Sequence, residues 1–314
     1  MTTINTIEQR RVIRSHGVFL DTTPENFGYL RDSTDLLGDP VGQRERMAHD
    51  GYLFLPGLLN RGEVLAARAE VVRRLSEGGI LKTGTDPMDA IIAPGKTCAF
   101  LPELALNNTP MAKVLYAGPM MAFFATFFGE PVRHFDFTWF RAISPGNGTP
   151  SHCDSVYMNR GTQRLYTAWT PFGDVSLELG GLMVLEGSNN NQRLKETYGS
   201  QDVDSFCENK PDAKKWGKAW GTGGSLHGNP NQIRKSVAAG NPFGGRWLTS
   251  EYRAGDVLLF SIYTVHASLD NTTTDRIRFS SDTRYQPASE PADERWIGPN
   301  PIGHGPAGKK GKIC

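Results

Sequence analysis

The amino-acid sequence predicts a mainly β protein with flanking helices, whose core is a β-sandwich or jelly roll. A series of short strand-like segments follows residue 130 without alternating helices, which argues against a parallel α/β sheet. The clearest helical patterns lie before residue 130. The chain also contains 35 Gly and 20 Pro among 314 residues. This composition suits short strands and loops better than a helical bundle.

The expected elements of the N-terminal part are bounded by clear start and stop signals. They are a helix over 43–50, a strand over 52–55, a helix over 60–78 and a helix over 119–129. Gly51 stops the first helix. Asn60 is a good N-cap, and Glu63 follows it at the spacing of a capping box. Pro119 and Gly129 suit the start and end of the last helix. Residues 1–40 show no period and are expected to wrap the surface.

The remaining elements are short strands separated by Gly or Pro. They are expected over 134–140, 164–172, 182–185, 247–252, 257–268 and 276–285. A polar insert over 189–246 interrupts this series. So long a loop is uncommon unless it is functional or disordered. Because Trp216 and Trp220 argue against disorder, we interpret the insert as a lid over the substrate.

A single domain accounts for the length. We expect an N-terminal extension with helices over 1–130, a jelly-roll core over 131–290 that carries the 189–246 insert, and a C-terminal tail over 291–314.

Charge and cysteine content limit the partners and the compartment. Lys and Arg number 34 against 33 Asp and Glu, so neither nucleic acid nor an anionic membrane is expected as a partner. No secretory signal is visible, and the most apolar segment, 120–128, is too short to span a bilayer. The four cysteines form no CxxC pair. We therefore expect a cytoplasmic protein; the oligomeric state cannot be read.

Two histidines and one aspartate are candidate metal ligands. His152 and Asp154 form an HxD motif, and residues two apart on an extended segment point to the same side. His266 ends the apolar run 257–265 and could instead be a satisfied core histidine. Together the three supply the facial triad typical of non-haem Fe(II) oxygenases. Zinc deaminase and HExxH patterns are absent.

A third motif follows His266 by about a dozen residues. Arg278 and Ser280 share one face of an expected strand, and an Arg fork with a hydroxyl suits a carboxylate. A surface ion pair with Asp275 or Asp282 is the alternative interpretation.

Five segments of the chain resemble the phytanoyl-CoA dioxygenase family, in the family's order between about residues 44 and 290. They are Ala48–Leu59, Gly180–Ser188, Gly255–Phe260, His266–Ser268 and Arg284–Pro287. The resemblance implies a double-stranded β-helix (jelly-roll, cupin-like) core, Fe(II), 2-oxoglutarate and O2. It implies that His152, Asp154 and His266 bind the iron.

The resemblance also implies a residue for the far carboxylate of 2-oxoglutarate. We prefer Arg278, with Ser280 beside it, and Arg276 is the competing choice. Thr167 and Trp169 are weaker candidates for lining the cosubstrate, since both also suit ordinary sheet packing.

The activity implied is hydroxylation of a small organic molecule, or its desaturation or cyclisation, with release of succinate and CO2. Related halogenases carry a small residue in place of Asp154, so oxygenation is favoured. An acyl-CoA substrate need not follow from the family name. Two alternatives remain, a jelly-roll binding protein that has lost catalysis and a zinc-dependent hydrolase that uses the same triad.

The substrate site is only outlined by the sequence. Candidate contacts for an anionic group are Arg141, Arg160 and Lys96, each of which also suits a solvated charge. The aromatic residues expected near the pocket, which also suit core packing, are Phe135, Phe137, Trp139 and Phe140.

Overall fold

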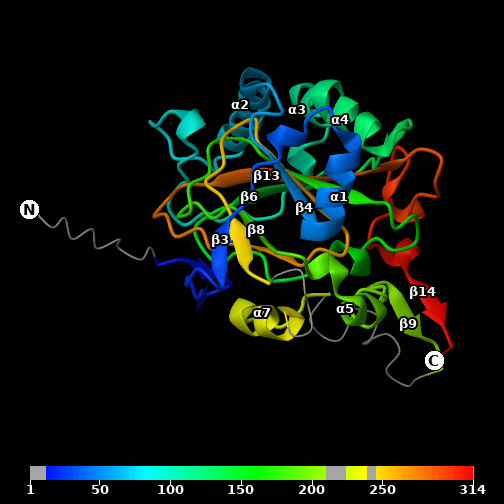
Figure 1. Cartoon of the computed structure of the whole chain (residues 1–314). Helices are drawn as coiled ribbons and strands as arrows, with labels where there is room; N and C mark the ends of the chain where they lie inside the picture. Colours follow the sequence, from blue (N-terminus) through cyan, green and yellow to red (C-terminus); the bar gives the residue numbers. More distant parts are fainter. Residues whose placement is uncertain (1–11, 210–223, 239–244, 314) are drawn as a thin grey trace, which may run out of the picture.

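The strand-like segments of the sequence form two facing β-sheets in the computed structural model, which describes residues 12–209, 224–238 and 245–313 (Figure 1). The larger sheet has the order β4-β11-β7-β13-β5, and β6 also pairs with β13. Its strands are β4 (Tyr52–Leu55), β5 (Val132–His134), β6 (Trp139–Ile143), β7 (Tyr166–Pro171), β11 (Val257–Ser261) and β13 (Arg278–Pro287). All of its pairings are antiparallel.

The smaller sheet has the order β12-β8-β10-β3. Its strands are β3 (Phe27–Tyr29), β8 (Leu182–Leu185), β10 (Trp247–Thr249) and β12 (His266–Ser268). From β7 onward the chain passes back and forth between the two sheets, and apolar side chains of both, such as Leu258 and Val184, share one core. The fold is therefore the predicted jelly roll. The N-terminal segment contributes β3, which pairs parallel with β10, and a hairpin of β1 (Arg14–Ser15) and β2 (Val18–Phe19).

Helices cover the outer face of the larger sheet (Figure 1). They are α1 (Pro40–Asp50), α2 (Arg61–Glu77), α3 (Thr109–Tyr116) and α4 (Gly118–Phe128). Gly51 ends α1 in the left-handed conformation at φ 84°. The Asn60 side chain accepts the Glu63 N–H at 3.1 Å, as predicted. The Glu63 carboxylate pairs with Lys113 instead of closing a capping box. Short 3-10 helices lie over Thr34–Leu36, Pro87–Asp89, Pro102–Leu104, Asp154–Val156 (η4), Ser188–Asn190, Glu294–Trp296 and Pro306–Gly308.

The run Thr109–Phe128 is long and apolar enough to satisfy a length-and-composition criterion for a membrane-crossing helix. This is weak support for a span, because extended backbone at Ala117 divides the run into α3 and α4. The Phe124 ring stacks on Tyr285 of β13 with centroids 4.2 Å apart. The run therefore packs as core helices of the jelly roll do.

Two predicted strands are each divided in the structure. The 257–268 segment leaves the larger sheet after Ser261 and enters the smaller sheet at His266, because a turn closed by the Thr264 N–H and the Ser261 carbonyl redirects the chain. His266 is therefore on β12 and not at the end of one long strand. The 134–140 segment is split into β5 and β6, which pair with successive parts of β13.

The insert and the tail have regular structure of their own. The described insert contains α5 (Gln192–Glu196), β9 (Ser205–Cys207) and α7 (Pro230–Ala238), and the tail strand β14 (Lys310–Lys312) pairs parallel with β9. Trp216 and Trp220 lie outside the described residues. Among the described cysteines, Cys98 and Cys153 are free thiols and Cys207 is disulfide-bonded, which the sequence did not predict. The compartment stays a prediction.

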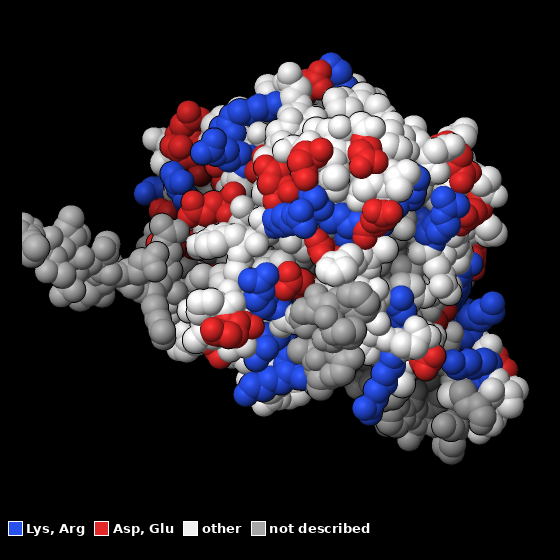
Figure 2. All heavy atoms as spheres, viewed as in Figure 1, with Lys and Arg blue, Asp and Glu red and all other residues white. Residues whose placement is uncertain are grey.

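Charged side chains of both signs are interspersed over the face shown in Figure 2. Several form exposed pairs, such as Arg73 with Glu70 and Glu77 on α2.

Candidate metal centre

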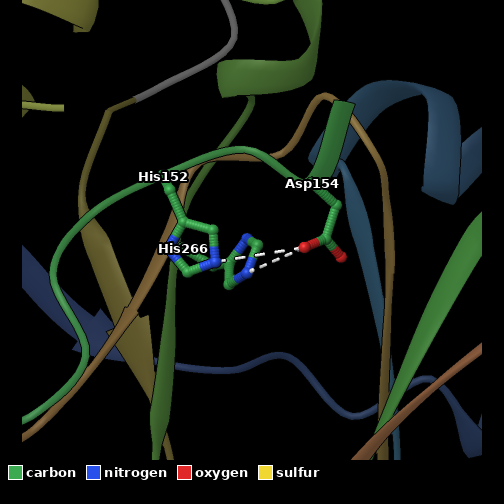
Figure 3. A group of neighbouring side chains, drawn as sticks. All are labelled: His152, Asp154 and His266. Atoms are coloured by element: carbon green, nitrogen blue, oxygen red, sulfur yellow. Dashed lines mark ion pairs between the residues drawn. The ribbon is translucent and has the colours of Figure 1, made fainter. Parts of the chain in front are cut away.

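The three candidate ligands converge at one point between the sheets (Figure 3). His152 and His266 form an antiparallel bridge, in which each backbone N–H donates to the other residue's carbonyl at 3.0 Å. Asp154 begins η4 immediately after this bridge. The HxD motif is therefore extended through Cys153 and turns at Asp154, where the 3-10 helix η4 begins and directs the carboxylate toward the imidazoles. The Asp154 Oδ1 atom lies 3.9 Å from His152 Nε2 and 3.8 Å from His266 Nε2.

Backbone carbonyls fix the orientation of both imidazole rings. His152 Nδ1 lies 2.8 Å from the Pro150 carbonyl, and His266 Nδ1 lies 3.0 Å from the Thr264 carbonyl. With Nδ1–H donating to these carbonyls, each Nε2 presents a lone pair toward Asp154. Burial lowers the pKa of His152 to about 3. His152 is therefore neutral, which is the form that binds metal.

The Asp154 carboxylate is held by its second oxygen. Oδ2 accepts hydrogen bonds from Thr167 Oγ1 at 2.5 Å and from Arg284 Nη2 at 2.9 Å. Burial opposes the negative charge, but Arg284 and the two histidines outweigh it and hold the pKa of Asp154 well below its usual range. Oδ1 thus remains available as an ionised ligand between the imidazoles.

Arg284 is a site residue that the sequence reasoning missed. It was noted only as part of the Arg284–Pro287 segment. The sequence could nevertheless have placed it. Arg284 lies an even number of residues after Arg278 and Ser280 on β13, so its side chain shares their face. Thr167, directly across from Arg284 on β7, contacts the Asp154 carboxylate.

Arg278 and Ser280 lie on the inner face of β13, whereas Arg276 is exposed just before the strand. The Arg278 guanidinium is 5.8 Å from the centre of the Trp169 ring. Among the described residues, nothing hydrogen-bonds to its Nε and Nη1 or to Ser280 Oγ, although all three atoms are buried. Burial lowers the pKa of Arg278 to about 10, which still leaves it protonated at neutral pH. An unpartnered buried cation beside a free hydroxyl fits an anionic carboxylate.

The insert lies against the HxD segment. The Leu226 N–H donates to the Ser151 carbonyl at 2.7 Å, and the Val203 N–H donates to the Val156 carbonyl at 3.0 Å. The Tyr198 hydroxyl accepts the Cys153 N–H at 3.3 Å.

The other residues that the sequence suggested for substrate binding do not come together in the structure. Arg160 pairs with Asp202 and Glu294, and Lys96 is exposed. Phe140 points to the helical side, where it packs on Phe279, so it cannot line the site.

The remaining aromatic candidates form one buried cluster with residues of the tail. Its members include Phe135, Trp139 and Trp296, with Phe137 partly buried against them. Of the three cationic residues that the sequence suggested for substrate contact, Arg141 lies on the inner face across from Ser280, and its Nη nitrogens have no described hydrogen-bond partner.

The donor set can be judged from this geometry. Two imidazole nitrogens and one carboxylate oxygen, all within 4.8 Å of one another, form the facial triad of non-haem iron sites. Such a triad leaves open coordination positions for a bidentate cosubstrate and for O2. The residues present therefore fit Fe(II) and 2-oxoglutarate.

Comparisons with known proteins agree with this chemistry. The model of the family described as phytanoyl-CoA dioxygenase matches residues 47–280. The 1-deoxypentalenic acid 11-beta-hydroxylase of Streptomyces arenae is 26% identical over 277 residues, which are 84% of this chain and 87% of the relative.

Solved structures share the fold. The carbocyclase SnoK from nogalamycin biosynthesis, a non-haem α-ketoglutarate-dependent enzyme, has a TM-score of 0.53 at 19% identity, with 78% of this chain and 83% of that chain covered. The epimerase SnoN, in complex with Fe3+, α-ketoglutarate and nogalamycin RO, has a TM-score of 0.51 at 21% identity, with 84% and 94% covered.

The family match covers well over half of the chain and includes all three residues of the triad. It selects the oxygenase over the two alternatives, the inactive binding protein and the zinc hydrolase. The chain therefore belongs to the phytanoyl-CoA dioxygenase family and is a 2-oxoglutarate-dependent non-haem iron oxygenase that acts on a small molecule.

Proposed function

We propose that this oxygenase hydroxylates a ring-containing natural product, with His152, Asp154 and His266 as the iron ligands and Arg278 with Ser280 as the site of the far carboxylate of 2-oxoglutarate. The observation that carries the assignment is the buried Arg278 guanidinium without a described partner, on the same face of β13 as Arg284, which contacts Asp154. A buried cation in that state costs several kcal/mol unless an anion occupies the site.

Each residue has a distinct task in this proposal. Fe(II), 2-oxoglutarate and O2, when bound, supply the oxidative decarboxylation that is coupled to oxidation of a C–H bond. Thr167 and Arg284 hold Asp154 through Oδ2, so that Oδ1 would be the oxygen that binds the iron. Trp169 packs beside the Arg278 guanidinium and excludes water from it. The sequence suggested that Thr167 lines the cosubstrate. In this proposal Thr167 instead holds Asp154, which is the metal ligand.

The hydroxylation and the natural-product substrate are supported by the Streptomyces relative, whose name gives 1-deoxypentalenic acid as the molecule that it hydroxylates. The insert is proposed to cover the site, as the sequence suggested, and its hydrogen bonds to Ser151 and Val156 support this role.

The test is succinate release by the Fe(II)-loaded enzyme with 2-oxoglutarate and ascorbate, first alone and then with pools of cyclic natural products. We expect slow uncoupled succinate release that a substrate accelerates, together with a product that has gained one oxygen by mass spectrometry. A product that has lost two hydrogens would replace hydroxylation with desaturation. No succinate under any condition would contradict the proposal.

A further inference from the structure

Arg141 lies in a row of residues that face the metal centre. It is directly across from Ser280 on β13, and on its other side it forms an antiparallel bridge with Phe100. Directly opposed residues of paired strands point to the same face. Arg141 therefore shares the inner face with Arg278 and Arg284, and its charge contributes to the lowered pKa of both His152 and Arg278.

Only one nitrogen of the Arg141 guanidinium has a described hydrogen-bond partner. Its Nε donates to Asp282 Oδ2 at 2.9 Å. Within the part of the chain that the structure describes, its two Nη nitrogens have no hydrogen-bond partner, and the side chain is 25% exposed. The deeper Arg278 is 1% exposed. Arg141 is thus more exposed than Arg278, the residue proposed for the cosubstrate.

The charged groups around the metal centre have a net charge of +1. The described charged groups that contact the triad or lie across from the cosubstrate position are three guanidiniums and two carboxylates, namely Arg141, Arg278, Arg284, Asp154 and Asp282. Fe(II) and the dianion of 2-oxoglutarate cancel one another, and the buried His152 is neutral. Arg284 pairs with Asp154 and Arg141 pairs with Asp282, so the occupied centre has a net charge of +1, and the two Nη nitrogens of the partly exposed Arg141 are the donors that a further anion can reach.

Apolar surface adjoins this cation. The guanidinium lies 5.5 Å from the centre of the Phe100 ring, which is 43% exposed, and the Phe100 ring lies 6.5 Å from that of Phe137. A ligand bound here would contact both the Arg141 guanidinium and the aromatic rings. A single excess charge matches a monocarboxylate better than a phosphate monoester, which carries nearly two negative charges.

We propose that Arg141 binds the carboxylate of an apolar, ring-containing monocarboxylic acid and thereby positions it for oxidation. This inference rests on the proposed function and adds the substrate class. The acid is held by the two Nη nitrogens while Asp282 fixes Nε, and its hydrocarbon body lies against Phe100 and Phe137.

The experiment is affinity selection without O2, so that no turnover occurs. The enzyme with Fe(II) and 2-oxoglutarate is mixed with paired probes, cyclic terpenoid and aromatic acids and the methyl ester of each, and the retained probes are identified by mass spectrometry. We expect the wild type to retain at least one acid about tenfold better than its ester, and Arg141→Gln to lose that preference. Arg141→Lys, which keeps the charge, should recover part of it.

Arg61→Gln is the matched control, because Arg61 also pairs with one aspartate, Asp174, but on the exposed surface. It should bind the probes as the wild type does. Equal retention of acids and esters by the wild type, retention of no acid, or an unchanged preference in Arg141→Gln would each overturn the inference.

Two further measurements separate this inference from the proposed function. If the wild type releases no succinate, the proposed function itself fails. If Arg141→Gln raises the KM for 2-oxoglutarate in uncoupled turnover, Arg141 belongs to the cosubstrate site and the inference is wrong.

Discussion

The two faces of β13 differ although all ten residues of the strand are buried. Toward the metal centre the strand presents only polar and charged side chains: Arg278, Ser280, Asp282 and Arg284. Toward the helices it presents Phe279, Ser281, Thr283 and Tyr285. On the helical face the Tyr285 hydroxyl donates to the Leu115 carbonyl at 2.6 Å and accepts from Thr283 at 3.0 Å.

Burial alone therefore does not identify the functional face; a buried charge without a partner does. The helical face has rings stacked on rings and a hydroxyl chain that ends on a carbonyl. The inner face keeps a buried guanidinium whose Nε and Nη1 have no described partner. A neutral orphan hydroxyl costs about 1–3 kcal/mol, and an orphan charge costs more. The unpaired charge is what requires a ligand.

Removal of a metal ligand should abolish activity, which is the largest effect expected on the inner face. We expect Asp154→Ala and His152→Ala to lose 2-oxoglutarate-dependent succinate formation, because two protein ligands no longer hold the metal at the centre. Metal content after desalting and succinate yield are the measurements. Normal turnover in either variant would overturn the ligand assignment.

A change on the opposite side of the sheet should affect stability instead. Phe124→Ala removes a buried ring that stacks on Tyr285, and we expect the free energy of unfolding to fall by about 3–5 kcal/mol. Denaturant unfolding measures this loss. The KM for 2-oxoglutarate, measured at low temperature on the folded protein, should stay unchanged. A raised KM would show that the two faces are not independent.

Arg278→Met should separate binding from stability. The KM for 2-oxoglutarate should rise roughly 10- to 150-fold, since a charged hydrogen-bonding partner is worth about 1.5–3 kcal/mol. Stability without cosubstrate should hold or increase, because an unpaired buried cation is replaced by an apolar side chain of similar length. The exposed Arg276→Met is the control. If Arg276→Met raises the KM instead, the assignment is wrong by two residues.

The sequence predicted much of the fold because local signals bound its elements. Gly51, Asn60 and Gly129 stop or start helices where expected, and β4 and β8 have the predicted bounds. The division of 257–268 was missed, since an apolar run gives no sign of where a chain crosses from one sheet to another. Hydrogen bonds, not periodicity, make that turn.

The site residues could be predicted where the residue type and its spacing along a strand are enough to identify them. Both histidines and Asp154 could be named in advance, because few side chains bind iron. The hydrogen bonds of Thr167 and Arg284 to Asp154 could not be, because they depend on which strands are neighbours. Pairing between distant segments is set by the assembled sheets and not by local sequence.

The smallest expected effect compares two adjacent hydroxyls on opposite faces of β13. Ser280 Oγ and Ser281 Oγ are both buried without a described partner, so neither hydrogen bonding nor burial distinguishes them. If Ser280 contacts the carboxylate of 2-oxoglutarate, Ser280→Ala should raise the KM for 2-oxoglutarate by about tenfold, the lower end of the value of one hydrogen bond to a charged group. Ser281→Ala should leave the KM unchanged, because its side chain faces the helices. Equal effects of the two substitutions would mean that strand strain, and not contact with the cosubstrate, accounts for both.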